Sequence, residues 1–180
     1  MRVIGVDPGA THTGIVVAEF SGSMTGTVMH QQTLHRPSPI EEFLPIENEY
    51  LVEVRRTLED LIAKWRPDYA GVETVNRPSW WIGGRAKPAN PEPIIATAII
   101  LGVAMGVALD RFPAWEVYQI PPDGNGAGAF GYYPECLVSK RERGQLNWRT
   151  RQAGKGALCH ERSAYDVAVQ TARTVRRGNR

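Results

Sequence analysis

The sequence predicts an α/β protein built on a mixed five-stranded sheet with helices on both faces. Two observations predict it. Three strand-like segments come first, joined by short turns, and the remaining strands alternate with helices. Neighbouring strands joined by tight turns pair antiparallel, whereas strands joined through helices pair in parallel. A length of 180 residues suits one domain, and no repeat or long linker divides it, so we expect a single domain over 1–180.

The opening of the chain predicts a hairpin with a carboxylate at the tip of a buried strand. An apolar run ends at Asp7, Pro8-Gly9 forces a turn, and a second apolar run begins at Ile15. A carboxylate beside a core is costly unless a cation or another polar partner compensates it. The alternative is that Asp7 caps the turn through its own backbone. The expected strands of this part are 2–7, 13–20 and 25–34.

Apolar spacing predicts two helices with different surroundings. The segment 47–66 is amphipathic, with apolar residues at steps of three and four. The segment 94–112 is apolar almost all round, so it must be buried on more than one side, which predicts a subunit interface as well as a core contact. Further strands are expected at 68–75 and 114–120, a last helix at about 162–176, and loops at 35–46, 76–90 and 121–158.

Composition argues against several classes of protein. Two cysteines are too few for a disulfide scaffold, which favours a reducing, cytoplasmic setting. No run of eighteen apolar residues is free of polar interruption, so we expect no membrane span. The N-terminus lacks the pattern of a signal peptide. The Gly-rich segment 123–131 lacks the Lys-Ser/Thr ending of a P-loop, and we expect no organic cofactor.

Charge is distributed unevenly along the chain. The net charge is +2, yet residues 140–180 contain eleven Lys and Arg against three acids. A basic end of this density suggests a polyanionic partner such as nucleic acid. For residues 173–180 alone, a solubilising tail is an equally good interpretation.

Three carboxylates are candidates for chemistry: Asp7, Glu73 and Asp166. Asp7 and Glu73 lie at the ends of strands that can be neighbours. Asp166 lies on the last helix among small apolar residues, which would place it against the sheet. Convergent carboxylates repel one another unless cations lie between them, and oxygen ligands suit Mg²⁺ or Mn²⁺. Two such ions ~4 Å apart are a common device for the attack of water on a phosphodiester.

Four stretches of the chain resemble RuvC-type Holliday-junction resolvases, which are RNase H-like nucleases. They occur in the family's order, near its spacing and over nearly the whole chain. They are Asp7-Pro-Gly-Ala-Thr-His-Thr-Gly14, Ala70-Gly-Val-Glu73, Leu101-Gly-Val-Ala-Met-Gly-Val-Ala108 and Ser163-Ala-Tyr-Asp166-Val-Ala.

The resemblance implies an RNase H-like fold and an endonuclease that cleaves branched DNA. It implies that Asp7, Glu73 and Asp166 are catalytic residues that hold two Mg²⁺ ions, for which Mn²⁺ can substitute. One ion would help generate the attacking hydroxide, and the other would stabilise the leaving 3′ oxygen. The enzyme would be a homodimer, and we expect its interface on the 94–112 helix.

The last helix departs from the family pattern. The family usually carries a second acid or a His three residues before the final Asp, where this chain has Ser163. His160 and Glu161 are the other candidates for a fourth ligand. On a helix, residues 160, 163 and 166 spread over roughly 120°. We therefore count His160 as catalytic if the helix begins early enough; otherwise it is a cap or a DNA contact. We assign no role to His12 and His35.

Two segments are candidates for DNA binding. The loop after Glu73 places aromatic residues beside basic ones, which suits unstacked bases and phosphates. Basic residues of 121–158, a segment we expect to be poorly ordered, would contact phosphates. Packing of a Trp onto the core and ordinary surface charge are the alternatives. The candidates are Trp80, Trp81, Arg85, Lys87, Lys140, Arg141, Arg143, Arg149, Arg151 and Lys155.

Other functions compete with a resolvase. A broader RNase H-like, structure-selective nuclease would use the same carboxylates. A catalytically inactive protein that binds branched DNA would have no need of them. An actin-like ATPase or kinase also opens with a strand, an Asp and a Gly/Thr-rich hairpin, but it needs a second such domain.

Overall fold

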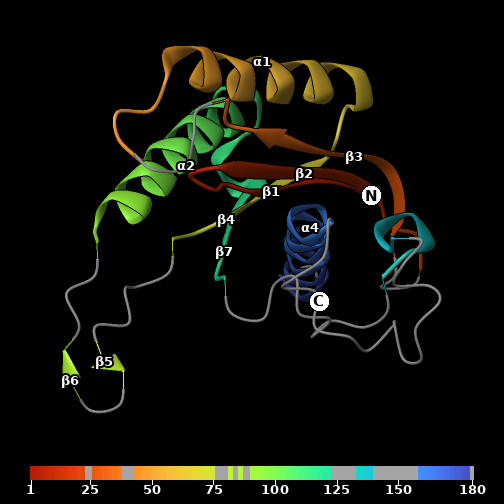
Figure 1. Ribbon diagram of the computed structural model, residues 1–180. Coiled ribbons are helices and arrows are strands. Elements are labelled where there is room, and N and C mark those ends of the chain that lie inside the picture. The colour runs from red at the N-terminus through yellow and green to blue at the C-terminus, as the bar shows by residue number, and fades with distance from the viewer. Residues whose placement is uncertain are drawn as a thin grey trace.

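The fold is a central sheet between two layers of helices. The computed structural model describes residues 1–22, 26–37, 43–75, 81–82, 85–86, 90–122, 133–139 and 158–178, with only the backbone for 81–82 and 85–86. Helices α1 (Asn48–Trp65) and α2 (Glu92–Arg111) cover one face of the sheet, and α4 (Cys159–Gly178) crosses the other (Figure 1).

The sheet is mixed and five-stranded, as predicted, with β1 in its centre. Its order is β3-β2-β1-β4-β7. The first three strands pair antiparallel, whereas β4 is parallel to β1 and β7 is parallel to β4. Chain direction thus brings the carboxyl ends of β1 and β4 to the same edge. The strands are β1 (Arg2–Asp7), β2 (His12–Glu19), β3 (Thr27–His35), β4 (Tyr69–Glu73) and β7 (Val117–Ile120).

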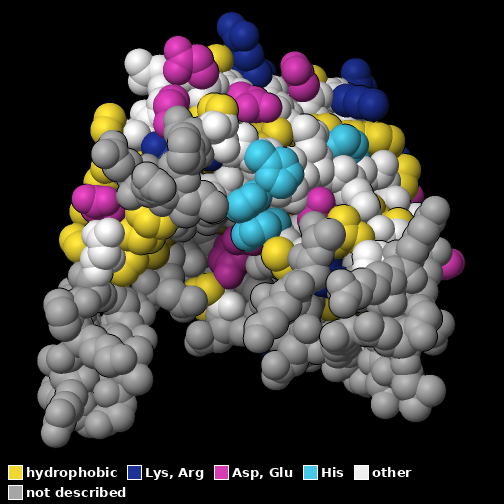
Figure 2. Space-filling view, viewed as in Figure 1, with side chains coloured by type: hydrophobic (Ala, Val, Ile, Leu, Met, Phe, Trp, Pro, Cys, Tyr) yellow, Lys and Arg dark blue, Asp and Glu magenta, His cyan; other side chains and the backbone are white. Residues whose placement is uncertain are grey.

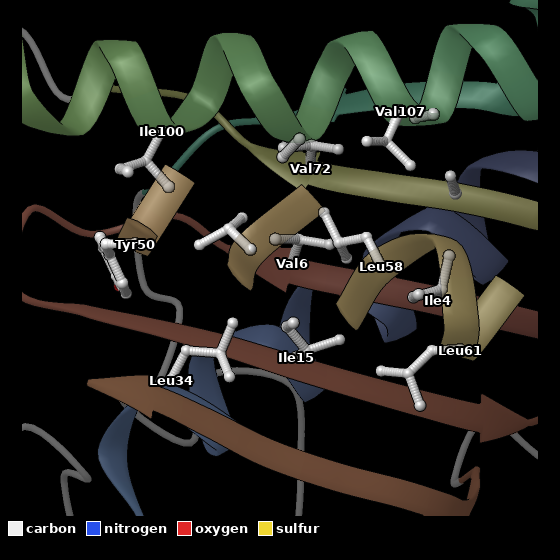
Figure 3. Close-up of a cluster of buried hydrophobic side chains, with 14 of the residues drawn as sticks. Ile4, Val6, Ile15, Leu34, Tyr50, Leu58, Leu61, Val72, Ile100 and Val107 are labelled. Atoms are coloured by element: carbon white, nitrogen blue, oxygen red, sulfur yellow. The ribbon is translucent and has the colours of Figure 1, made fainter. Parts of the chain in front are cut away.

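Alternate residues of each strand serve the two cores. Ile4 and Val6 of β1 join Val72 of β4 in the core beneath α1 and α2 (Figure 3). Val3 lies in a separate cluster with the apolar residues of α4. This alternation follows from the period of two along a strand. Asp7, which follows Val3 at even spacing, therefore points toward the α4 side.

Glycines bring α4 unusually close to the sheet. A Cβ atom at Gly5 would overlap the carbonyl oxygen of Ala164, and one at Gly14 would overlap the carbonyl oxygen of His160. A Cβ atom at Gly71 would overlap the Thr171 side chain. Three neighbouring strands therefore lack side chains where the helix passes, which fixes its height and its position along the sheet.

Helix α2 has a buried side and an exposed apolar side. Ile100 and Val107 belong to the core, whereas Ile95, Ile99 and Leu109 are 45%, 39% and 51% exposed. Among the described residues, α2 is also the one helix long and apolar enough to cross a membrane by length and composition alone. A core helix of a soluble protein meets the same criterion, and α2 packs on α1 and β4. These contacts do not cover the apolar residues on the exposed side of α2.

Several local features differ from the sequence-based expectation. Helix α4 begins at Cys159, about three residues earlier than predicted, so His160 is helical. The expected loop 76–90 contains a pair of two-residue strands, β5 (Trp81–Ile82) and β6 (Arg85–Ala86). Of 121–158, the part between 133 and 139 packs on α4 and includes the 3-10 helix η2 (Glu135–Leu137). A second 3-10 helix, η1 (Ala114–Glu116), precedes β7.

Candidate active site

The candidate site is built on the shared carboxyl-terminal edge of β1 and β4. The two strands are in parallel register, with Val6 beside Val72. Asp7 and Glu73 are the next residues, so they end neighbouring strands ~5 Å apart. Both lie two residues beyond the glycines that face α4. Their side chains therefore point toward the face of the sheet that α4 covers.

The first two turns of α4 meet these carboxylates. His160 Nδ1 lies 3.1 Å from Asp7 Oδ2, and Ser163 Oγ donates a hydrogen bond of 2.8 Å to Glu73 Oε2. Glu73 and Ser163 are buried, whereas the His160 side chain is 34% exposed. The site thus places buried polar groups next to the partly exposed imidazole of His160. Close passage of α4 over Gly14 is what allows His160 to reach Asp7.

The electrostatics of the site favour a charged His160. Its hydrogen bond to Asp7 raises the pKa of His160 above the ordinary value of 6.5, and the charges of Asp7 and Glu161 act in the same direction. Burial opposes this shift. The His160–Asp7 contact is therefore a hydrogen-bonded ion pair when the imidazole is protonated.

Asp166 lies away from this pair in the structure. Its Oδ2 accepts a buried hydrogen bond of 2.6 Å from the Tyr133 hydroxyl. Tyr133 in turn lies under the guanidinium of Arg162, 5.9 Å from the ring centroid. Asp166 is two residues, or about 200° of arc, from both Ala164 and Ala168, which meet the sheet at Gly5. It therefore faces the 133–139 segment, and the expectation that it packs against the sheet is wrong.

The structure distinguishes the three candidates for the fourth ligand by the side chains that they contact. His160 and Ser163 reach the strand carboxylates, one each. Glu161 is buried, and no described residue donates a hydrogen bond to its Oε2. The pair of helix residues three apart that faces Asp7 and Glu73 is thus 160 and 163, whereas the sequence motif had suggested 163 and 166.

The donor set suits a hard divalent cation held jointly with substrate. Within the described ranges, no three His, Cys, Asp or Glu side chains converge on one point. Asp7 and Glu73 nevertheless present two carboxylates at an open edge. Mg²⁺ is typically held by one or two carboxylates together with water and substrate phosphate, so these residues fit one such ion. Asp166, as oriented here, does not add to them.

The predicted DNA contacts lie outside the residues that the structure describes. Of the DNA-contact candidates in the loop after β4, Trp81 and Arg85 are described by their backbone alone. These contacts stay predictions. The residues wholly outside the described ranges are Trp80, Lys87, Lys140, Arg141, Arg143, Arg149, Arg151 and Lys155.

The structure adds side chains to which the sequence analysis assigned no role. His12 and His35 gather with His160, because the His12 ring stacks on the His160 ring and meets the His35 ring edge-on. Tyr133 holds Asp166. The strand pairing of 13–20 with 25–34 could have suggested that His12 and His35 are close, since they flank that pairing. No pattern in the sequence pointed to Tyr133.

Comparison with known proteins places this fold and site in context. No model of a known protein family matches the chain. RuvC crossover junction endodeoxyribonucleases of Synechococcus sp. (strain WH7803) and Parasynechococcus marenigrum (strain WH8102) are 34% and 35% identical over 76 and 77 residues. Each match covers 41% of this chain and 44% of the relative, so the chain matches less than half the length of these curated relatives.

Solved structures extend the likeness over the whole chain. RuvC of T. thermophilus in complex with a Holliday junction substrate has a TM-score of 0.60 and 24% identity, with 99% of this chain and 96% of that chain covered. A second structure of the T. thermophilus protein has a TM-score of 0.57 at the same identity, with 99% and 97% covered.

These comparisons show the fold class of the protein. The mixed five-stranded sheet, with acidic residues at the ends of its central strands and a helix crossing them, is the RNase H-like fold of RuvC. Within that class, the chain resembles RuvC-type Holliday-junction resolvases in fold and, over 76 residues, in sequence.

Proposed function

We propose that this protein is a metal-dependent endonuclease that cleaves branched DNA of the Holliday-junction type. The observation that carries the proposal is the meeting of Asp7 and Glu73 with His160 and Ser163 at one edge of the sheet. The likeness to RuvC, in sequence and in fold, supports the choice of substrate.

The side chains of the site have separable roles in this proposal. Asp7 and Glu73 would hold a divalent ion, Mg²⁺ or Mn²⁺. When bound, such an ion would supply the positive charge that stabilises the phosphate and makes a water molecule a better nucleophile. Ser163 fixes the orientation of Glu73 by donating to Oε2. Because Asp7 engages Nδ1 of His160, Nε2 is the nitrogen that can exchange a proton with the substrate.

The sequence-based assignment of Asp166 and a second ion stays a prediction. For Asp166 to join Asp7 and Glu73, its carboxylate would have to leave the Tyr133 hydroxyl. The His160 and Ser163 positions supply one imidazole and one hydroxyl beside the carboxylate pair, and hydroxyls are weaker metal ligands than carboxylates. These side chains suit a site that binds one ion tightly and a second ion only when DNA is present.

A homodimer through α2 completes the proposal. The exposed residues Ile95, Ile99 and Leu109 lie on one side of the helix, together with Ala98, Gly102 and Gly106. Spacing of four between Ala98, Gly102 and Gly106 leaves a groove that a second helix could approach closely. Apart from the backbone of α2 itself, no atom of the described residues lies within 4 Å of a Cβ placed at Gly102 or Gly106. Two copies would present two sites to the symmetric junction.

Removal of one carboxylate tests the proposal. Asp7→Asn should abolish Mg²⁺-dependent cleavage of a synthetic four-way junction while leaving junction binding within about threefold, because the fold and the basic segments are unchanged. Asp60→Asn, on the exposed face of α1, is the matched control and should cleave normally. Cleavage by Asp7→Asn at the wild-type rate would rule out the mechanism.

A panel of substrates separates this function from its alternatives. Junction, flap, nicked duplex and RNA–DNA hybrid are incubated with Mg²⁺ or Mn²⁺. We expect preference for the junction. Equal cleavage of flap and junction would identify a broader structure-selective nuclease. Tight junction binding without cleavage of any substrate would identify an inactive branched-DNA binding protein, an outcome that the Ser at position 163 makes worth testing.

A further inference from the structure

A row of three imidazoles runs from the candidate active site across the edge of the sheet. His160 comes from α4, His12 from the start of β2 and His35 from the end of β3. His12 and His35 are cross-strand partners in register. The His12 ring is stacked on the His160 ring at 5.0 Å with an interplanar angle of 10°, and it meets the His35 ring edge-on at 4.8 Å and 86°. Figure 2 shows histidine side chains gathered beside acidic ones on one face of the molecule.

The row is poorly arranged to bind a metal ion. Imidazole nitrogens bind metals through lone pairs that lie in the ring plane. Two rings stacked face to face direct those lone pairs along parallel planes, so they do not meet at one point. Among the described residues, no group of three potential metal ligands includes these histidines. A role in holding one ring by another fits the geometry better.

His12 has supports of its own that do not depend on His160. Its Nδ1 lies 2.8 Å from Thr11 Oγ1. The Thr11 carbonyl accepts a hydrogen bond of 2.9 Å from the backbone N–H of Arg36, which ties the turn to the end of β3. The His12 ring also makes an edge contact with the His35 ring. These contacts support the His12 ring independently of His160.

The His160 ring likewise makes one hydrogen bond with the described residues. Only Nδ1 is engaged, by Asp7, and no described residue bonds Nε2. One hydrogen bond leaves the ring able to tilt about that contact, and a parallel ring alongside prevents the tilt. We propose that His12 is a positioning residue for His160, whose ring it holds so that Nδ1 meets Asp7 and Nε2 faces the substrate. This inference rests on the proposed nuclease function.

The charges of the two rings agree with this role. The pKa of His12 is lowered by burial first and then by the charges of His160 and His35, whereas Asp7 raises the pKa of His160. The His160 ring, which is more readily protonated, thus lies flat against a ring that is less readily protonated. An aromatic face attracts a cation placed over it.

Two substitutions of His12 distinguish a role of its flat ring from a role of its ring nitrogen atoms. His12→Phe keeps a flat ring, and His12→Ala removes it; His30→Ala, a β3 histidine that contacts Gln32, is the matched control. On a four-way junction with Mg²⁺, His12→Ala should lower kcat about tenfold or more with KM within about twofold, since small misplacements of a catalytic group are costly. His12→Phe should recover most of kcat, and His30→Ala should change neither constant.

A second measurement does not require nuclease activity. Long-range ¹H–¹⁵N NMR spectra of the metal-free full chain report the His160 ring, assigned by comparison with His160→Gln. We expect His12→Ala to move the His160 resonances and His12→Phe and His30→Ala to leave the hydrogen-bonded Nδ1 signature in place. Unmoved His160 resonances in His12→Ala, or a kcat for His12→Phe as low as for His12→Ala, would overturn the proposal. If the wild type cleaves nothing, the proposed function fails, and the NMR result still decides whether His12 positions His160.

Discussion

His160 shows how one residue can link the stability of this protein to its chemistry. The imidazole bonds Asp7 through Nδ1, and the pKa of His160 is raised as a result. A histidine whose folded pKa exceeds the unfolded value of 6.5 stabilises the fold fully below that value. The contribution is lost as pH rises through the folded pKa. The same hydrogen bond that orients the His160 ring therefore makes stability depend on pH.

A pH comparison tests this linkage. In the absence of divalent cations, His160→Gln should lower the urea midpoint more at about pH 5.5 than at about pH 8.5. His12→Gln should show the opposite difference, because burial and neighbouring charge lower the pKa of His12, and the fold loses stability as His12 is forced to protonate. Equal losses at both pH values for His160→Gln would show that the bond to Asp7 does not favour the protonated ring.

The Tyr133–Asp166 hydrogen bond predicts a structural cost. It is buried, 2.6 Å long and made to a carboxylate. Tyr133→Phe should therefore lower the free energy of unfolding by about 1–3 kcal/mol, measured by urea denaturation. Asp166→Asn should be destabilised to a similar degree. If Asp166→Asn instead abolishes cleavage at unchanged stability, Asp166 acts as the metal ligand that the sequence motif suggests.

Residue by residue, strands were easier to interpret from sequence than the last helix. Asp7 and Glu73 could be predicted because strand periodicity fixes both the end of each strand and the face of its side chains. Asp166 was placed on the wrong side of α4. A strand residue has two possible directions, whereas a helix residue has a full circle, and the direction depends on how the helix sits on the sheet. Three glycines that lie far apart in the chain set that position.

At the scale of elements, the packing of α4 is the feature on which the site depends. The helix contacts β1, β2 and β4, and its first two turns carry His160 and Ser163. Glycines at the crossing points remove the side chains that would separate helix from sheet. The sequence showed these glycines, but their common purpose emerges only when the strands are placed side by side.

Gly5→Ala tests this dependence. The added Cβ would meet the backbone of Ala164, which cannot yield as a flexible side chain would. We expect a loss of about 1–3 kcal/mol in the free energy of unfolding. Cleavage should also fall under conditions where the variant remains folded, because α4 moves and carries His160 with it. Gly22→Ala is the control, because no atom of the described residues lies within 4 Å of its added Cβ, and it should change neither property. If Gly5→Ala has the same free energy of unfolding as the wild type, α4 can shift to accommodate the added Cβ without loss of stability.

At the scale of the molecule, the exposed apolar side of α2 is a feature that packing within a single chain does not explain. Helix α2 was predicted to be buried on more than one side, and the structure buries one. Its opposite side exposes Ile95, Ile99 and Leu109. Exposed apolar side chains that cluster on one element mark contact surfaces, whereas isolated ones do not. Val52 of α1, 43% exposed, is an isolated example.

This contrast provides the test of the proposed dimer. Ile99→Glu places a charge in the middle of the apolar stripe, where a second copy would bury it, and burial of an unpaired charge is costly. We expect the wild type to be a dimer at about 10 μM by light scattering and Ile99→Glu to be a monomer with an unchanged circular dichroism spectrum. Val52→Glu should remain a dimer, since its side chain lies on another helix. A wild-type monomer at this concentration would contradict the proposed dimer.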